Sequence, residues 1–446
     1  MPAKHWMMFS TFAEQDFFTY PRANAYSGVI INANMACYAP AGLASFITGK
    51  LHHSTEYIID PLTHAFQHDP VCICKEDGSL KQSIQGLAEM CGEPILTSAG
   101  KNPLEPDSLD NNHIANITKS VLEFQRNHLR SYMEADDSAK YLEEAQLKTP
   151  YALIPPYFFL TETDWRDWLN VNMQCVHIAA GLISNDEHLF AEIVVDRGVL
   201  LDSTIINEII DAYSQVADSL AGCLLWIDDF NEEEVPITEL RAMKSLCVAL
   251  RQVFAEVINI HGGYYSIMLS GNIGENCLTG ISHGPEFGEF RPVVPVGGGI
   301  PIARYYVPRL HARVRYREAL GLFRSAGWLD SVATFHQEVC DCEECVAVLE
   351  GNTANFIRFG EGEIKNVRRG GGMASIQFPS GDTKKRCLRH YLQRKHREYR
   401  MIDEANAEQV IAELNDSIKL HERFLGDSGV RHLKRWHTAL KPLDVE

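Results

Sequence analysis

The sequence lacks the features of a membrane or secreted protein. No stretch approaches the 18 or more apolar residues that a membrane-spanning helix needs. The first residues, Met1 to Trp6, lack the apolar run and the small-residue cleavage site of a secretory signal. The 12 cysteines are too sparse for a disulfide scaffold, and most stand singly in apolar stretches, which is typical of reduced core thiols. We therefore expect a cytoplasmic protein without a membrane partner.

Positive charge is also scarce. The chain has 446 residues, with 41 Lys and Arg against 59 Asp and Glu, and its formal net charge is -18. Taken alone, this balance argues against a general nucleic-acid binder. The charge is unevenly distributed, however, because residues 1–300 carry a net charge of -22 and residues 301–446 a net charge of +4. The chain therefore has an acidic body and a mildly basic C-terminal third.

Short β-type apolar runs alternate with helical patterns, such as residues 204–220 and 237–254. This alternation favours parallel strands and predicts a (β/α)₈ barrel, with a doubly wound open sheet as the alternative. We expect the barrel in residues 1–335, with a helical insertion at about 71–149 after the second strand. Residues 336–446 are expected to form a helical, zinc-binding subdomain. The predicted strands are 29–34, 56–60, 151–158, 191–196, 223–229, 256–261, 277–283 and 303–307.

Several predicted strands end in polar residues or glycine. In a (β/α)₈ barrel, the C-terminal ends of the strands form the active face, so these residues predict a site there. The alternative for each of them is a plain strand-to-loop turn. The residues concerned are Asp60, Asp228, Asp229, His261, Gly262, Gly263, His283 and Gly284.

Three cysteines, Cys340, Cys342 and Cys345, lie within six residues. Thiols at this spacing can converge on one ion, and Zn²⁺ prefers four such ligands in a closed tetrahedron. The fourth ligand is expected on a predicted helix 40 to 50 residues later, where His390, Cys387 and His396 are the candidates. With four protein ligands the zinc ion would be structural.

The cysteine run and the downstream segment 388–392 resemble the zinc site of the tRNA-guanine transglycosylase superfamily. The resemblance extends over residues 28–70 and 150–400, and it implies a (β/α)₈ barrel with zinc held by Cys340, Cys342, Cys345 and His390. The segment around Asp60 is similar to the one in which the family places a catalytic aspartate. Where the family has its nucleophilic aspartate, before a run similar to residues 307–313, this chain has Tyr305.

The divergence and the long insertion make the chain most similar to the DNA-acting members, which insert a 7-deazaguanine base into DNA. The resemblance implies exchange of guanine through a covalent glycosyl-aspartate intermediate. We expect Asp60 to be the general acid/base and Asp228 the nucleophile or a base-recognition carboxylate. The base, extruded from the duplex, is expected to contact the remaining strand-end residues, namely Asp229, His261, Gly262, Gly263, His283 and Gly284.

Three alternatives differ in substrate or chemistry. The chain could act on tRNA instead of DNA, or it could be a catalytically inactive barrel that binds nucleic acid. A metal-dependent hydrolase of the same barrel class is disfavoured, because residues 29–34 contain no histidine pair.

The C-terminal third contains the cations that a polynucleotide needs. They are expected to contact backbone phosphates, whereas the alternative for each cluster is a solvated helix face. Helper proteins are expected partners if a duplex must be opened. The predicted nucleic-acid contacts are Arg304, Arg309, His311, Arg313, Arg368, Arg369, Lys384 and Lys385.

Overall fold

The computed structural model describes residues 3–9, 26–52, 54–135, 148–271, 273, 277–284, 289–294, 301–369 and 372–441. It divides into two compact units, Met1–Val296 and Gly297–Glu446. This division comes earlier in the chain than the expected one at 335/336, because the segment after residue 301 packs with the C-terminal helices. Within the described residues, no helix is long and apolar enough to cross a membrane.

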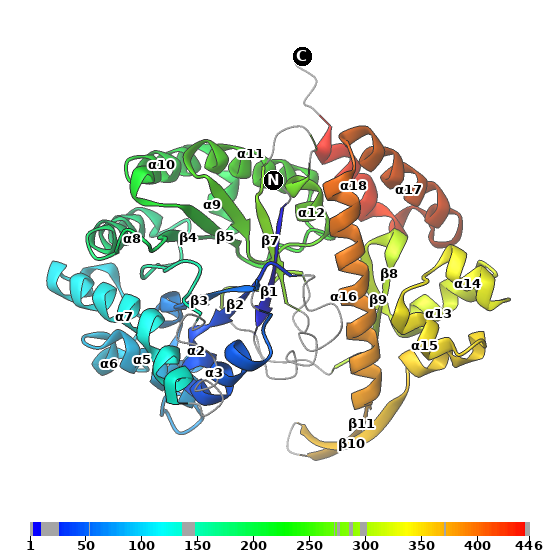
Figure 1. Cartoon of the computed structure of the whole chain (residues 1–446), viewed down its shortest axis with the longest axis horizontal. Helices are drawn as coiled ribbons and strands as arrows, with labels where there is room; N and C mark the ends of the chain where they lie inside the picture. The colour runs from blue at the N-terminus through cyan, green and yellow to red at the C-terminus, as the bar shows by residue number, and fades with distance from the viewer. Residues whose placement is uncertain are drawn as a thin grey trace. The chain divides into compact units, whose positions relative to one another are not determined.

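The first unit is built around a curled sheet of seven parallel strands (Figure 1). Their order is β3-β2-β1-β7-β6-β5-β4, and every neighbouring pair is parallel. β2, β4 and β5 are buried along their whole length, as expected for a parallel sheet that is covered on both faces. The strands are β1 Lys4–Phe9, β2 Gly28–Asn32, β3 Glu56–Asp60, β4 Phe190–Val195, β5 Gly222–Ile227, β6 Glu256–Asn259 and β7 Gly280–His283.

Helices follow most of the strands and flank the sheet (Figure 1). Short 3-10 helices occur at Thr63–Gln67, Pro106–Ser108 and Ala217–Ser219. The α-helices are α2 Ala33–Tyr38, α3 Pro40–Gly49, α4 Pro70–Ile73, α5 Gln82–Cys91, α6 Ile95–Ser98, α7 Asn111–Ala135, α8 Trp165–Ala180, α9 Arg197–Leu201, α10 Ser203–Ser214, α11 Ile237–Val253 and α12 Tyr264–Ser270.

The sheet differs from the expected strand set in two respects. β1 was not predicted, yet it lies inside the sheet between β2 and β7. The helical insertion, α4 to α7, therefore follows the third strand rather than the second, and its last helix ends at Ala135.

The predicted strand 151–158 does not form a regular strand; Leu153 makes an isolated bridge to Leu189, just before β4, and Leu160 makes one to Val195 in β4. The amide of Tyr151 donates a 2.7 Å hydrogen bond to the carbonyl oxygen of Tyr57 in β3. Further along, the amide of Leu160 donates a 2.9 Å bond to the carbonyl oxygen of Val194 in β4. The segment thus contacts both edge strands of the sheet.

The second unit contains two antiparallel hairpins and several helices. The predicted barrel strand 303–307 is wrong in its placement: β8 (Arg304–Val307) pairs antiparallel with β9 (Ala312–Arg315), and both belong to this unit. The other elements are α13 Tyr316–Ser325, α14 Val332–Glu338, α15 Glu343–Leu349, α16 Gly381–Glu404, α17 Ala407–Gly429 and α18 Arg431–Leu440, with 3-10 helices at Pro308–Leu310 and Thr353–Phe359.

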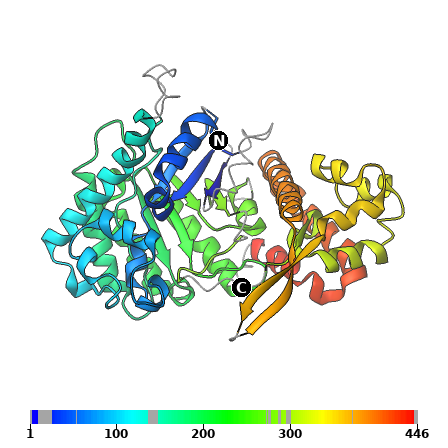
Figure 2. The same cartoon turned by 90° about the horizontal axis from the view of Figure 1, so that it is seen from below.

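The second hairpin, β10 (Gly362–Arg369) with β11 (Gly372–Pro379), projects from its unit as a two-stranded arm (Figure 2). Ile364 and Met373 are 76% and 71% exposed. At its base, the amide of Ser380 donates a 3.1 Å bond to the carbonyl oxygen of Glu361. Thr383 in the first turn of α16 donates to the same oxygen at 2.8 Å, so the arm is attached to the start of this helix.

Candidate functional site

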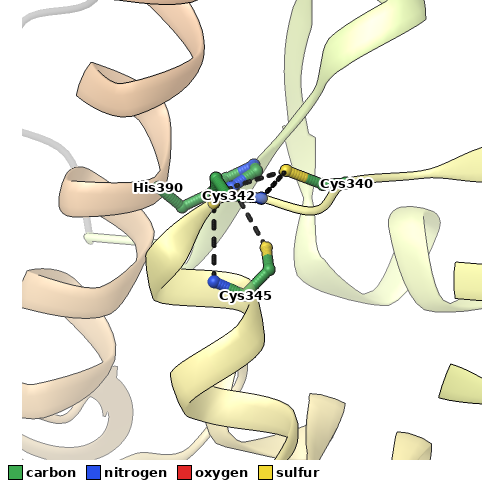
Figure 3. A group of neighbouring side chains, drawn as sticks. All are labelled: Cys340, Cys342, Cys345 and His390. Atoms are coloured by element: carbon green, nitrogen blue, oxygen red, sulfur yellow. Dashed lines mark hydrogen bonds between the residues drawn. The ribbon is translucent and has the colours of Figure 1, made fainter. Parts of the chain in front are cut away.

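Four potential metal ligands meet in the second unit (Figure 3). The Sγ atoms of Cys340, Cys342 and Cys345 lie 3.7, 3.3 and 3.3 Å from Nδ1 of His390. All four residues are buried, and their ligand atoms lie within 4.8 Å of one another. Three thiolates and one imidazole match the donor set of a closed tetrahedral zinc site. The predicted group of four residues is confirmed, and it is compatible with a structural zinc ion.

Local backbone geometry holds the three thiols together. Cys342 is the N-cap of α15, and its Sγ accepts a hydrogen bond from the amide of Cys345 at 3.4 Å. The Sγ of Cys340 accepts one from the amide of Cys342, also at 3.4 Å. Amide donors stabilise thiolates, the form in which cysteine binds a metal ion.

The orientation of His390 is set by a second hydrogen bond. Its Nε2 donates to the carbonyl oxygen of Tyr306 in β8 at 2.7 Å, which leaves the Nδ1 lone pair directed at the thiols. The other two candidates for the fourth ligand do not join this group. Cys387 instead donates to the carbonyl oxygen of Phe359 at 3.4 Å, and His396 lies nearly two turns further along α16.

Tyr305 belongs to the same centre. It is fully buried, its ring stacks on His390, and its hydroxyl lies 3.1 Å from Sγ of Cys345. Tyr305 therefore has a structural contact with two members of this group.

In the first unit, Asp60 ends β3 and is completely buried. Its Oδ1 accepts hydrogen bonds from the hydroxyl of Tyr157 at 2.7 Å and from the amide of Leu62 at 2.9 Å. Burial raises the pKa of Asp60 to about 6, against the opposing effects of these two donors and of Arg291. A carboxyl group with such a pKa exchanges its proton near neutral pH, as a general acid/base requires.

Sequence reasoning missed three residues around Asp60. Tyr157 lies in the segment 151–158, and His64 Nδ1 is 3.2 Å from its hydroxyl. Glu192 is buried in the middle of β4, where burial and then the charge of Asp60 raise its pKa well above the usual value. The available signal was a carboxylate inside the otherwise apolar run 190–195.

Asp228 and Asp229 follow β5 and contact the segment 291–293. Oδ1 of Asp228 accepts a 2.6 Å hydrogen bond from the amide of Val293. The amide of Asp229, which has a φ of 45°, donates to the carbonyl oxygen of Arg291 at 3.2 Å, and the Trp226 indole donates to the same oxygen at 3.0 Å. The charge of Arg291 also lowers the pKa of Asp60, so this residue lies near the end of β3 as well.

His261, Gly262 and Gly263 follow β6. The ring of His261 is buried, with its centroid 4.7 Å from that of Trp226, and burial and then Arg291 lower its pKa well below the usual value. A Cβ atom on Gly262 would lie 2.6 Å from the side chain of Ile281, and one on Gly263 would lie 2.7 Å from Glu232 Oε2. Close packing therefore accounts for a glycine at both positions.

His283 ends β7 and is buried, with its ring centroid 5.9 Å from that of Tyr26. Gly284, which follows it, is also buried. The imidazole therefore lies at the same end of the sheet as Asp60 and His261.

The predicted phosphate contacts fall into three groups. Arg304, Arg309, Lys384 and Lys385 are exposed, and the half-buried Arg313 lies over the ring of Tyr391 at 4.8 Å. Arg368 and Arg369 lie at the end of β10, and their side chains are outside the described residues.

His311 does not lie on the surface, so its assignment to phosphate binding is wrong. Its side chain is 3% exposed, with Nδ1 2.8 Å from Glu398 and Nε2 3.3 Å from Glu413. Burial opposes protonation, but Glu413 and Glu398 raise the pKa of His311 to about 9. The buried Glu398 and the half-buried Glu413 therefore hold this imidazole as a cation inside the unit.

A cleft of about 190 Å³ opens at the base of the β10–β11 arm. Its lining includes Arg315, Tyr316, Arg317 and Phe378 together with the backbone at Gly360 and Gly362. Arg315 and Arg317 are exposed. Two cations and two aromatic rings around a cleft are suited to a phosphodiester with an adjoining base.

Comparison with known proteins leaves the family open. No family model and no curated protein matches the chain. Among solved structures, it is similar to xylanase B from Clostridium stercorarium F9, at 11% sequence identity over 63% of this chain and 85% of that chain, with a TM-score of 0.32. A TM-score this low carries no argument about fold or activity.

Proposed function

We propose that this protein exchanges guanine for a 7-deazaguanine base, such as 7-cyano-7-deazaguanine, in DNA. The observation that carries the proposal is that Asp60 and Asp228 both lie at the C-terminal ends of parallel strands, with Asp228 hydrogen-bonded to the segment 291–293 and Arg291 of this segment near Asp60. Two carboxyl groups, one with a pKa near 6, are what a double displacement at a sugar carbon requires.

The chain's own residues divide the chemistry as follows. The Asp228 carboxylate bonds to C1′ while the bond from C1′ to the guanine nitrogen breaks, and Asp60 gives its proton to the leaving base. The incoming base then returns a proton to Asp60 and displaces Asp228 from C1′. Protons and charge balance over the two steps.

The proposed enzyme is a complete (β/α)₈ barrel, in which the segment 151–160 provides the eighth position between β3 and β4. Its hydrogen bonds to both edge strands support this interpretation. Zinc bound by Cys340, Cys342, Cys345 and His390 would have a structural role, because four protein ligands leave no position for a substrate.

The second unit supplies the contacts to the polynucleotide. We assign phosphate binding to the exposed Arg304, Arg309, Lys384 and Lys385, and to the cleft with Arg315 and Arg317. Such contacts are independent of sequence and sensitive to salt. All of these cations lie after residue 300, outside the part of the chain that carries the net charge of -22.

A second candidate, a barrel that binds nucleic acid without catalysis, is favoured by one observation. Tyr305, at the position of the family's nucleophile, is buried against His390 and has no carboxylate to offer. The two candidates differ in whether Asp228 can replace the missing nucleophile.

Incubation with isotopically labelled guanine and either duplex DNA, single-stranded DNA or tRNA separates these functions. We expect label to enter DNA in the wild-type protein and in Asp202→Asn, which changes only the N-cap of α10. Label in tRNA alone would replace DNA as the substrate. Binding without label in any polymer would favour the inactive barrel.

A further inference from the structure

The β10–β11 arm has two unequal faces. In an antiparallel ribbon, residues that pair in register point to the same side, and successive residues alternate between the two sides. One face therefore carries Lys365 with Ile376, and Glu363 with Phe378. Ile376 and Phe378 are half-buried, and Nζ of Lys365 lies 5.9 Å from the centroid of the Phe378 ring. This face is therefore partly covered.

The opposite face of the arm carries a row of five exposed side chains. Three of them have an amide or hydroxyl group, two are apolar and none is acidic. The Ser375 hydroxyl donates a 2.7 Å hydrogen bond to Oδ1 of Asn366, its partner in the register, so these two side chains lie side by side. We call the five residues the exposed row: Ile364, Asn366, Met373, Ser375 and Gln377.

The exposed row meets the cleft at the base of the arm. Gln377 lines this cleft together with Arg315 and Arg317. A Cβ atom on Gly362 would lie 3.0 Å from Cγ and from Nε2 of Gln377, so the glycine leaves the room in which the carboxamide lies. One carboxamide of the row and two guanidinium groups therefore line the same cleft.

The charge of the arm favours a polyanion as its partner. Residues 362–379 contain three cations, Lys365, Arg368 and Arg369, against one acidic residue, Glu363, which gives a net charge of +2. The whole chain has a net charge of -18. Glu363 forms a 2.8 Å ion pair with Lys365 on the partly covered face. The acidic group of the arm is thus neutralised on the side away from the exposed row.

Duplex DNA fits both the shape and the chemistry of this face. The major groove of B-DNA is about 12 Å wide and admits a two-stranded β-ribbon. Carboxamides of Asn and Gln pair with the adenine edge in this groove, serine hydroxyls pair with several base edges, and apolar side chains contact the thymine methyl group. The exposed row contains all three kinds of group. The major groove of A-form RNA, in contrast, is too deep and narrow for side chains to read.

We propose that the exposed row enters the major groove of duplex DNA and reads base edges there, with Asn366 and Gln377 pairing with adenines. Arg315 and Arg317 hold phosphates beside the same groove. The choice of DNA as the polymer rests on the proposed function. The inference adds a sequence preference, which contacts to phosphates alone do not provide.

Selection from a random pool of DNA duplexes, with the full-length protein and no incoming base, tests the inference. We expect the wild-type protein to enrich a short motif that contains adenine. Binding of this motif by the double variant Asn366→Ala/Gln377→Ala should be about a hundredfold weaker, or about tenfold for each lost carboxamide contact. Both side chains are exposed, so the double variant should fold as the wild type does.

Gln215→Ala is the matched control, because it removes an exposed carboxamide from the first unit, and it should bind the motif as the wild type does. Absence of an enriched motif with the wild-type protein would overturn the inference. Selection of the same motif, with wild-type affinity, by the double variant would also overturn it and would leave the exposed row to another partner, such as a protein.

Salt dependence separates base reading from phosphate binding. Asn366 and Gln377 are uncharged, so the double variant should keep the wild-type slope of log affinity against log salt concentration. Its affinity for a duplex without the motif should stay close to that of the wild type. An equal loss of affinity for duplexes with and without the motif would contradict base reading by the row.

A modified duplex tests the place of the contact without any protein variant. Replacing the adenines of the motif by 7-deazaadenine removes their N7 acceptors, which lie in the major groove. We expect the wild-type protein to bind about tenfold more weakly for each contacted adenine, and the double variant to lose nothing further. Equal wild-type affinity for the modified and unmodified duplexes would overturn the inference, and so would equal affinity for an RNA duplex of the same sequence.

These experiments measure binding, so they fail separately from base exchange. Sequence-selective binding of duplex DNA by the exposed row, without exchange in any polymer, would support this inference and refute the proposed function. Exchange in DNA without a sequence preference would support the proposed function and refute this inference.

Discussion

The ring of Tyr305 lies parallel to the imidazole of His390, with 4.1 Å between ring centroids and 14° between ring planes. His390 in turn donates to the carbonyl oxygen of Tyr306, the next residue of β8. The hairpin β8–β9, the helix α16 and the three thiols are thus joined at one point. The stability of the second unit should therefore depend on the metal.

Replacing one thiol should release the metal. We expect Cys342→Ser to lose about one zinc ion per chain and to lower the melting temperature of the second unit by about 10 °C or more, because bound zinc contributes folding free energy. Elemental analysis and calorimetry provide the two readouts. Cys387→Ser, on the same helix as His390, should keep its zinc. Equal zinc contents in Cys342→Ser and the wild type would refute the assignment.

The buried His311 makes stability depend on pH. Its pKa is about 9 when folded against an ordinary value of 6.5, so its contribution is complete below pH 6.5 and is lost as pH rises through 9. The stability difference between wild type and His311→Gln should therefore shrink by about 3 kcal/mol between pH 6 and pH 9.5. Urea unfolding of both proteins across this range measures it.

The difference between the two proteins isolates His311 from other groups in the same unit. Burial lowers the pKa values of His421 and His432 to about 4, and the charge of His311 contributes to both shifts, so the comparison is made from pH 6 upward, where both imidazoles are neutral in the folded protein. A stability difference that stays constant from pH 6 to pH 9.5 would contradict a charged His311.

Asp60→Asn should slow base exchange by about a hundred- to ten-thousand-fold, the range typical for loss of a general acid/base. The amide keeps the volume of the side chain, and its oxygen can still accept from Tyr157 and Leu62. Folding, followed by circular dichroism, should therefore be unchanged. Wild-type turnover by a folded Asp60→Asn protein would remove Asp60 from the chemistry.

The cleft at the base of the arm should contribute to DNA affinity at every sequence. Replacing Arg315 and Arg317 together by Gln should reduce the slope of log affinity against log salt concentration by about two, one for each lost phosphate contact. Fluorescence anisotropy with labelled DNA at several salt concentrations measures the slope. Lys419→Gln, an exposed cation on α17, is the control. An unaltered slope in the double variant would place the DNA elsewhere.

Local patterns predicted much of the fold. Nearly continuous apolar runs correctly indicated β3, β4 and β5 to within a few residues, because strands covered on both faces have few polar positions. β1 was not predicted as a strand, because its first residues, Lys4 and His5, shorten the apolar run to four residues. The segment 303–307 has a composition similar to that of a barrel strand, and only its pairing with β9 and its contact with His390 in the structure reveal that it belongs to the second unit.

Local sequence patterns also predicted part of the candidate site. The spacing of the three cysteines was sufficient for the metal group, whereas His390 could be chosen over Cys387 only from its orientation. Glu192 was not predicted as a site residue, because a single carboxylate in a strand does not show which face of the sheet it occupies. His311 was misassigned because the sequence does not show that Glu398 and Glu413 surround it.

Mass spectrometry of DNA nucleosides, after incubation of the protein with DNA and 7-cyano-7-deazaguanine, measures base exchange directly. We expect a new 7-deazaguanine deoxynucleoside and free guanine in equal amounts, both absent with Asp60→Asn. Unchanged DNA, with no guanine released by a folded, zinc-loaded wild-type protein, would contradict base exchange in DNA.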